Sequence, residues 1–196
     1  MEHATLIIGI TGGSGCGKTT LLNSIAEKGG LILDCDAIYH RLLAEDPTLL
    51  SAIEARFPGV VEDGILQRKK LGNIVFSDEN ALRDLNKITH AAVKTEVLRQ
   101  LEAAPALAAI DAIGLFEGDL AQLCQVTVAV TAPAEDRVAR LMARDGIPEA
   151  YARKRIAAQR SNEEFSALCN YTLENDGEIC TFRAKCLAFL ADIGIM

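Results

Sequence analysis

The chain has 196 residues, of which 49% are apolar and 24% are charged, a balance that is typical of one compact globular domain. Its formal net charge of −7 argues against a general nucleic-acid binder, because such proteins usually present a basic surface. No apolar run is long enough to cross a membrane and no signal peptide precedes the first strand, so we expect a cytoplasmic protein with reduced cysteines and no membrane partner.

The apolar residues at 5–10 do not alternate with polar ones, which predicts a parallel strand buried on both faces. A glycine-rich turn follows, then a helix at 19–27 and a short strand at 31–34. Helical periodicity runs through 37–56, with a break near Asp46-Pro47, and through 65–104, with a loop at 57–64 between them. The remaining strands are expected at 106–112, 126–131 and 170–174, and the remaining helices at 133–144, 148–160 and 178–192.

Apolar strands that alternate with helices indicate an α/β fold, here a five-stranded parallel sheet with helices on both faces. We expect a single domain, 1–196, whose core is formed by 1–36, 105–144 and 166–196. Two helical stretches are longer than a crossover between parallel strands requires. We interpret 37–104 as a substrate-binding insertion and 145–165 as a mobile lid.

The turn after the first strand matches the phosphate-binding pattern G-x-x-x-x-G-K-[ST] in residues Gly12, Gly13, Ser14, Gly15, Cys16, Gly17, Lys18 and Thr19. Glycines allow successive backbone N–H groups to face inward, and the following helix directs its N-terminus at the same anion. We therefore expect these residues and Thr20 to bind ATP. Lys18 is expected to reach the β- and γ-phosphates, and the Thr19 hydroxyl to coordinate Mg²⁺.

Two aspartates follow predicted strands, at the sheet edge where ligands bind in open parallel sheets. Asp36 is a candidate base for an attacking hydroxyl, with the alternative that it only caps the helix from Ala37. Asp111 is a candidate for holding Mg²⁺ through water, with the alternative of a solvated strand end. Glu117, in the adjoining loop, is a candidate for lining the acceptor pocket.

A basic stripe follows the fourth strand: Arg137, Arg140 and Arg144 share one helix face, and Arg153, Arg155 and Arg160 follow. Such a stripe is more often a solvated face, but a lid over ATP needs arginines to neutralise the transition state. Arg144, beside Asp145-Gly146, is the best-placed candidate. We also hypothesise that the helix N-terminus and Lys18 lower the thiol pKa of Cys16 and make it sensitive to oxidation.

Taken together and in order, motifs between about residue 6 and residue 190 resemble those of the dephospho-CoA kinase family. They are the glycine motif at Thr11–Thr19, D-x-D-x-I-x-H at Asp34–His40, D-G-x-L-x-R at Asp63–Arg68 with Leu71 and Val75-Phe76, L-N-x-I-T-H at Leu85–His90, L-[FL]-E at Leu115–Glu117, Arg144-Asp145, Arg155–Gln159, and the N-x-G turn at Asn175–Gly177. The chain departs from the family pattern at Ala91, Ile113-Gly114 and Glu174.

The resemblance implies ATP- and Mg²⁺-dependent phosphorylation of the ribose 3′-hydroxyl of dephospho-CoA, the last step of coenzyme A synthesis. It implies that Asp36 is the catalytic base, that Arg144 and Lys18 stabilise the transferred group, and that Asn175 and Gly177 lie by the adenine. The residues implied on the acceptor side are Asp36, Arg68, His90 and Glu117, with 37–104 as the CoA-side subdomain.

Two other readings stay open at this point. The chain could be a P-loop kinase for a different small acceptor, such as a nucleoside monophosphate, or a nucleotide-binding protein that no longer transfers phosphate. In each case we expect a monomer or a small homo-oligomer.

Overall fold

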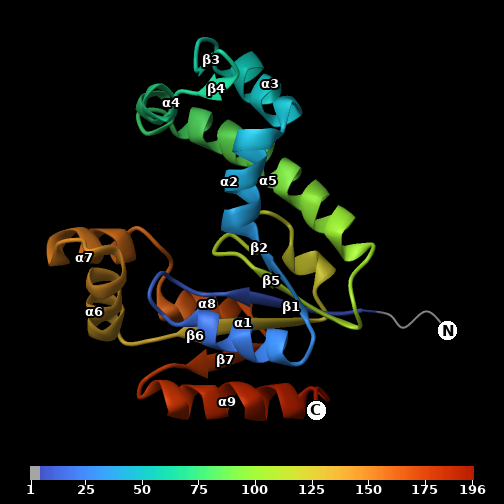
Figure 1. Ribbon diagram of the computed structural model, residues 1–196. Helices are drawn as coiled ribbons and strands as arrows, with labels where there is room; N and C mark the ends of the chain where they lie inside the picture. Colours follow the sequence, from blue (N-terminus) through green and yellow to red (C-terminus); the bar gives the residue numbers. More distant parts are fainter. Residues whose placement is uncertain (1–4) are drawn as a thin grey trace. The chain divides into compact units, whose positions relative to one another are not determined.

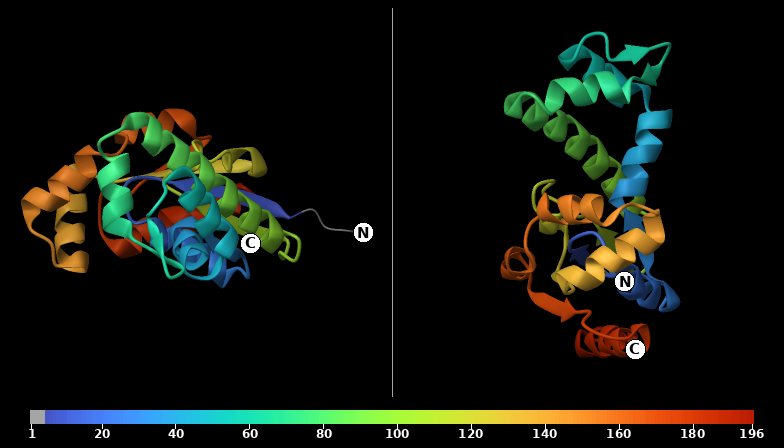
Figure 2. Two further views of the ribbon diagram at one scale, coloured as in Figure 1. Left: turned by 90° about the horizontal axis from the view of Figure 1, so that it is seen from above. Right: turned by 90° about the vertical axis from the view of Figure 1, so that its left-hand side faces the viewer.

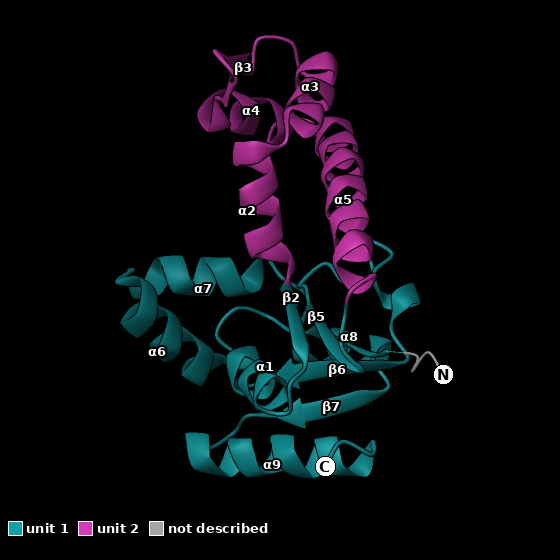
Figure 3. Ribbon diagram, turned by 45° about the vertical axis from the view of Figure 1, so that its right-hand side comes forward, with its two compact units in different colours: residues 1–33, 104–196 teal, residues 34–103 magenta. Residues whose placement is uncertain are grey.

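The chain folds into two compact units, which Figure 3 shows in different colours. The computed structural model describes residues 5–196. The sheet unit comprises residues 5–33 together with Ala104–Met196, and the helical unit comprises Asp34–Ala103. Within the described residues, no helix combines the length and the apolar composition that a membrane span needs.

The sheet unit is built on five parallel strands in the order β2-β5-β1-β6-β7, which confirms the predicted fold (Figure 1). Their bounds are β1 Leu6–Thr11, β2 Leu31–Asp34, β5 Leu107–Asp111, β6 Val126–Thr131 and β7 Tyr171–Glu174. β1 is the central strand, and Ile10 pairs in register with Asp111 of β5. Because the strands are parallel, their carboxyl ends lie at one edge, and the glycine-rich turn leaves β1 there.

Alternate residues of the central strands point to one face and form the main core with two helices. The helices are α1 (Lys18–Glu27) and α9 (Ile179–Asp192), which pack against each other (Figure 1). The core residues include Ile8 and Ile10 of β1, Val128 and Val130 of β6, Leu21 and Ile25 of α1, and Phe182 and Leu190 of α9. Full burial of each such side chain contributes about 1.5–3 kcal/mol, so the position of α1 behind the loop is firmly set.

Three further helices belong to the sheet unit: α6 (Ala134–Asp145), α7 (Glu149–Ala157) and α8 (Asn162–Leu168). α6 and α7 form a helical pair (Figure 2), held by a small core of Val138, Leu141 and Ala152. α8 was not expected from the sequence, although Ser161 and Glu164 form the capping box that opens it. It packs against β6. A short 3₁₀ turn, η1 (Ala121–Leu123), precedes β6.

The helical unit contains α2 (Cys35–Glu45), α3 (Pro47–Arg56), α4 (Arg68–Val75) and α5 (Glu79–Leu101). The helix expected over 65–104 is wrong at its start and in its middle. It begins as a strand, because β3 (Val61–Glu62) and β4 (Ile65–Leu66) form a hairpin, and Asp78 caps a new helix after α4. Asp63 and Gly64, which form the hairpin turn, have φ angles of 50° and 75°, as a two-residue Asp-Gly turn requires.

Candidate active site

The phosphate loop runs from the end of β1 to the start of α1, and Gly12 and Gly17 are among its positions where no side chain fits. Gly12 has φ 137°, and a Cβ there would lie 2.2 Å from the Val130 carbonyl oxygen. Gly17 has φ 96°, and a Cβ there would lie 2.2 Å from Nδ2 of Asn175. Both contacts are far closer than a real Cβ permits, so the loop cannot keep this path with any side chain at either position.

Three consecutive carbonyl groups of the loop each accept a hydrogen bond from a side chain that is distant in sequence. The bonds are Arg137 Nε to the Ser14 oxygen (3.0 Å), Arg140 Nη1 to the Gly15 oxygen (3.2 Å) and Asn175 Nδ2 to the Cys16 oxygen (2.9 Å). In a trans peptide unit, the N–H points opposite to the C=O. Fixing these oxygens on the outside of the loop therefore directs the N–H groups of Gly15 and Gly17 to the inside, where an anion can bind.

Lys18 and Asp111 lie at the ends of neighbouring elements. The Lys18 ammonium donates to the Gly12 carbonyl at 3.1 Å and lies 3.8 Å from Oδ1 of Asp111. Both side chains are largely buried, with exposed fractions of 15% and 17%. The ammonium is therefore held beside the loop, between the ends of β1 and β5.

The site also offers oxygen ligands for Mg²⁺ in the exposed Thr19 and in Asp111. Among the described residues, no group of three or more His, Cys, Asp or Glu side chains could form a metal cage. Mg²⁺ is usually held by one or two protein oxygens together with substrate phosphates and waters. A hydroxyl and a single carboxylate match that chemistry, so these residues fit a Mg²⁺ that arrives with a nucleotide.

The basic stripe does not act as one face. Arg137 is only 3% exposed and, like Arg140, supports the outside of the loop. Arg144 lies in the last turn of α6 with a side chain that is 61% exposed, and its guanidinium forms a bidentate pair with Asp145 at 2.7 and 2.9 Å. Arg155 also contacts Asp145, at 2.9 Å. The hydrogen bonds from Arg144 are the main reason why the pKa of Asp145 is lowered.

Other arginines of the stripe form ion pairs on the surface. Arg153 of α7 pairs with Glu149 of its own helix and with Glu135 of α6. Arg160 pairs with Glu117 through two hydrogen bonds of 2.8 and 2.6 Å. The predicted acceptor residue Glu117 is thus bound to the segment after α7.

Gln159 contacts the phosphate loop, a role that its local sequence does not predict. Its side chain makes two hydrogen bonds to Ser14 of the loop and accepts one from Arg137. The only signal in the sequence was its place at the end of the Arg155–Gln159 motif, and the contact itself joins residues that are 145 positions apart.

The hypothesis of a reactive Cys16 is wrong. Cys16 is 1% exposed, and burial raises the pKa of its thiol despite the opposing effect of Lys18. The loss of solvation outweighs the nearby positive charge. We therefore expect a protonated and inaccessible thiol that packs in the main core.

Asn175 and Gly177 lie after β7. Asn175 is buried, with 6% exposed, and its backbone N–H donates to the Thr131 carbonyl at 2.8 Å. The side-chain amide of Asn175 donates a hydrogen bond to the Cys16 carbonyl, whereas Gly177 is exposed. An adenine contact at this turn stays a prediction, to which the structure adds a supporting role for Asn175 under the loop.

Within the helical unit, Asp34 caps α2 by accepting a hydrogen bond from the Ala37 amide at 2.9 Å. The alternative reading of Asp36 as the cap is therefore wrong, because the helix starts two residues earlier, at Cys35. Asp36 lies exposed in the first turn. Arg68 begins α4 and its charge moderates the pKa of Tyr39, which burial raises. His90 is half-buried in α5.

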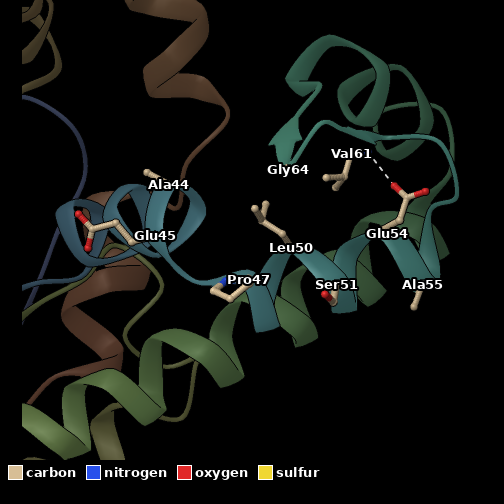
Figure 4. Close-up of a pocket in the computed structure, with 9 residues that line it drawn as sticks. All are labelled: Ala44, Glu45, Pro47, Leu50, Ser51, Glu54, Ala55, Val61 and Gly64. Carbon is tan, nitrogen blue, oxygen red and sulfur yellow. Dashed lines mark hydrogen bonds between the residues drawn. The ribbon is translucent and has the colours of Figure 1, made fainter.

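The helical unit also contains a pocket of about 590 Å³, which Figure 4 shows in close-up. Apolar side chains such as Leu50 and Val61 line it beside Pro47. The Glu54 carboxylate accepts a hydrogen bond from the Val61 amide at 2.7 Å and so fixes one wall. Glu45 and Ser51 add polar groups to the lining, and the hollow is open to solvent.

Comparison with known proteins points to one family. A sequence model of the dephospho-CoA kinases matches residues 6–181. The dephospho-CoA kinase of Latilactobacillus sakei is 32% identical over 186 residues, which are 92% of each chain. A crystal structure from Thermus thermophilus, 31% identical, matches with a TM-score of 0.81 over 97% of this chain and 98% of its own. The dephospho-CoA kinase from Campylobacter jejuni, 24% identical, shares the fold with a TM-score of 0.65 over 95% of this chain and 96% of its own.

Proposed function

The chain belongs to the dephospho-CoA kinase family, and we propose on this premise that it transfers the γ-phosphoryl group of ATP to the ribose 3′-hydroxyl of dephospho-CoA. The products are coenzyme A and ADP, so the reaction is the last step of coenzyme A synthesis. The observation that carries the proposal is the phosphate loop, with its outward carbonyls held by Arg137, Arg140 and Asn175 in a chain that matches the family from residue 6 to residue 181.

On the nucleotide side, the N–H groups of the loop and the N-terminus of α1 bind the phosphates. Lys18 neutralises charge on the β- and γ-phosphates, and Asn175 with Gly177 borders the adenine. Thr19 and Asp111 would hold a Mg²⁺ that arrives with the nucleotide. When bound, Mg²⁺ withdraws charge from the transferred group.

On the acceptor side, Asp36 accepts the proton of the 3′-hydroxyl as the phosphoryl group transfers. Arg68, His90 and Glu117 bind the remainder of the acceptor. We assign dephospho-CoA to the helical unit, where the pocket of about 590 Å³ suits the neutral arm of such a molecule.

The segment 145–165 is proposed to act as a lid, with Arg144 as its catalytic arginine. The pair with Asp145 keeps the Arg144 guanidinium in place until a phosphate competes for it. Phosphoryl transfer depends mainly on positioning and charge neutralisation, and closure would exclude the water that otherwise hydrolyses ATP.

We also propose a cytoplasmic location for the enzyme, as a monomer or a small homo-oligomer without nucleic-acid partners. The net charge of −7 supports the absence of nucleic-acid partners.

The test is ADP release by purified protein with ATP, Mg²⁺ and a panel of acceptors. We expect release that depends on dephospho-CoA and produces coenzyme A. Turnover with a nucleoside monophosphate or another alcohol instead would reassign the acceptor. Tight ATP binding without turnover on any acceptor would mean that the chain only binds nucleotide.

A further inference from the structure

Gln159 holds Ser14 of the phosphate loop by two hydrogen bonds. Its Oε1 accepts from the Ser14 amide at 2.8 Å, and its Nε2 donates to the Ser14 hydroxyl at 2.9 Å. Gln159 comes after α7, whereas Ser14 follows β1, so the contact links the end of the α6–α7 pair to the phosphate loop. The phosphoryl transfer described above gives this residue no task.

Arg137 closes the arrangement into a ring. Its Nη2 donates to the same Oε1 of Gln159 at 3.1 Å, and its Nε donates to the Ser14 carbonyl at 3.0 Å. Both the N–H and the C=O of Ser14 are therefore held by side chains. Because these two groups belong to successive peptide units, the units on either side of Ser14 are fixed together.

Gln159 and Arg137 reach the loop from its packed side. A Cβ on Gly13 would lie 2.1 Å from Nη2 of Arg137 and 3.0 Å from Oε1 of Gln159, and a Cβ on Gly15 would lie 2.8 Å from the Arg137 carbonyl. Arg137 itself is almost fully buried. No phosphate has room on this side, so Gln159 does not occupy the place of the ligand.

We propose that Gln159 is a positioning residue for nucleotide binding, which acts through Ser14 and keeps the later N–H groups of the loop aimed at the phosphates. The inference rests on the proposed function in one respect, namely that the loop binds the phosphates of ATP. The same N–H groups bind ATP and ADP, and they bind them in the ground state as well as in the transition state. Loss of their alignment therefore raises the KM for ATP and leaves kcat nearly unchanged.

The decisive variant is Gln159→Leu, which removes both polar atoms at similar volume. We expect the Kd of ATP and the Kd of ADP to rise together by roughly tenfold, the effect of losing the hydrogen bonds of a partly buried side chain. The kcat at saturating ATP and the KM for dephospho-CoA stay within about twofold. Binding is measured by calorimetry without any acceptor. The result can therefore be interpreted even if the proposed acceptor is wrong.

Ser14→Ala tests the same contact from the other side. It removes only the bond to the hydroxyl, so the Kd of ATP should rise by a smaller factor. In the double variant Ser14→Ala with Gln159→Leu, the Kd should equal that of Gln159→Leu alone, because the hydroxyl has already lost its partner. Gln122→Leu makes the same chemical change at an exposed position of η1 and should leave both Kd values unchanged.

Three results would overturn the proposal: unchanged nucleotide affinity in folded Gln159→Leu, tighter ATP binding, or a loss confined to kcat. Tighter binding would mean that Oε1 competes with a phosphate for the Ser14 amide. If Gln159→Leu does not fold, Ser14→Ala decides alone, and an unchanged Kd of ATP in that variant refutes the role.

Discussion

At the start of α2, two aspartates lie two residues apart and differ in what their carboxylates contact. Asp34 accepts a hydrogen bond from the Ala37 amide and ends β2, whereas Asp36 lies exposed in the first helical turn. The Asp36 carboxylate therefore takes no part in capping the helix. The two residues allow the same chemical change to be made at a structural and at a proposed catalytic position.

Asp36→Asn should lower kcat by about 10²–10⁴, because the amide cannot accept the proton of the attacking hydroxyl. The affinity for ATP should stay nearly unchanged. Steady-state kinetics with dephospho-CoA and calorimetric titration of ATP measure the two effects. Asp34→Asn is the matched control, since asparagine caps a helix as well as aspartate does. Turnover near that of the unmodified enzyme in Asp36→Asn would exclude the base role.

Arg144 pairs with its neighbour Asp145, whereas Arg137 and Arg140 of the same helix hold carbonyl groups of the phosphate loop. Arg144→Ala should lower kcat by about 10³ or more, as for an arginine that stabilises the transition state, while Kd of ATP changes far less. Arg153→Ala removes a surface ion pair between α6 and α7 and should stay near the unmodified rate. If only the Kd of ATP changes in Arg144→Ala, the residue anchors the nucleotide and does not act in the transition state.

At the scale of elements, the strands were the most predictable part of the sheet unit. The run at 126–131 coincides with β6 and the run at 31–34 with β2, because buried parallel strands are short, apolar and bounded by turns. The hairpin of β3 and β4 is not predictable from periodicity, because strands of two residues are too short to show alternation. Its Asp63-Gly64 turn was the available signal.

Only those parts of the site that depend on local sequence motifs could be predicted. The loop, Lys18 and the strand-end aspartates follow from motifs and from the geometry of parallel sheets. The tasks of Arg137, Asn175 and Gln159 do not, because each contacts a backbone group more than a hundred residues away. A row of arginines along a helix has the same sequence pattern whether its side chains contact solvent, a phosphate group or the outside of a loop.

In the helical unit, α2 and α5 are joined by a buried carboxylate. Glu96 of α5 is 8% exposed and accepts hydrogen bonds from Arg41 of α2 at 2.6 Å and from Arg99 of its own helix at 2.8 Å. Gln100 donates a further bond at 2.8 Å. The bonds from Arg99, followed by those from Arg41 and Gln100, lower the pKa of Glu96 well below its usual range despite burial.

Glu96→Gln should reduce the free energy of unfolding at pH 7 by roughly 1–3 kcal/mol, because charge-assisted bonds are replaced by neutral ones. Since the folded pKa is depressed, the carboxylate stabilises the fold above its unfolded pKa of about 4.3, and this contribution is lost as pH falls further. The difference between the two proteins should therefore shrink from pH 7 to pH 3 in urea unfolding. Glu79→Gln, on the same helix, is the control, and an equal difference at both pH values would contradict the prediction.

For the whole molecule, we propose that the sheet unit binds the nucleotide and that the helical unit binds the acceptor. In hydrogen exchange, ADP with Mg²⁺ should protect peptides covering 12–20 and 159–175, whereas dephospho-CoA should protect peptides within 34–103. At a ligand concentration of 100 times Kd, the stabilisation is about 2.7 kcal/mol, so amides that exchange by opening of the bound site slow by up to about 100-fold. Protection by dephospho-CoA in the sheet unit alone would reject the assignment of 34–103 to the acceptor.

The outward carbonyls of Ser14, Gly15 and Cys16 also bear on how the enzyme is made. The side chains that donate to these carbonyls, Arg137, Arg140 and Asn175, lie 123, 125 and 159 positions further along the chain. During translation, the residues of the phosphate loop leave the ribosome early but lack these supports until Asn175 has emerged. A nascent chain or a fragment that stops at β6 should therefore show no nucleotide affinity, although it contains the complete glycine motif.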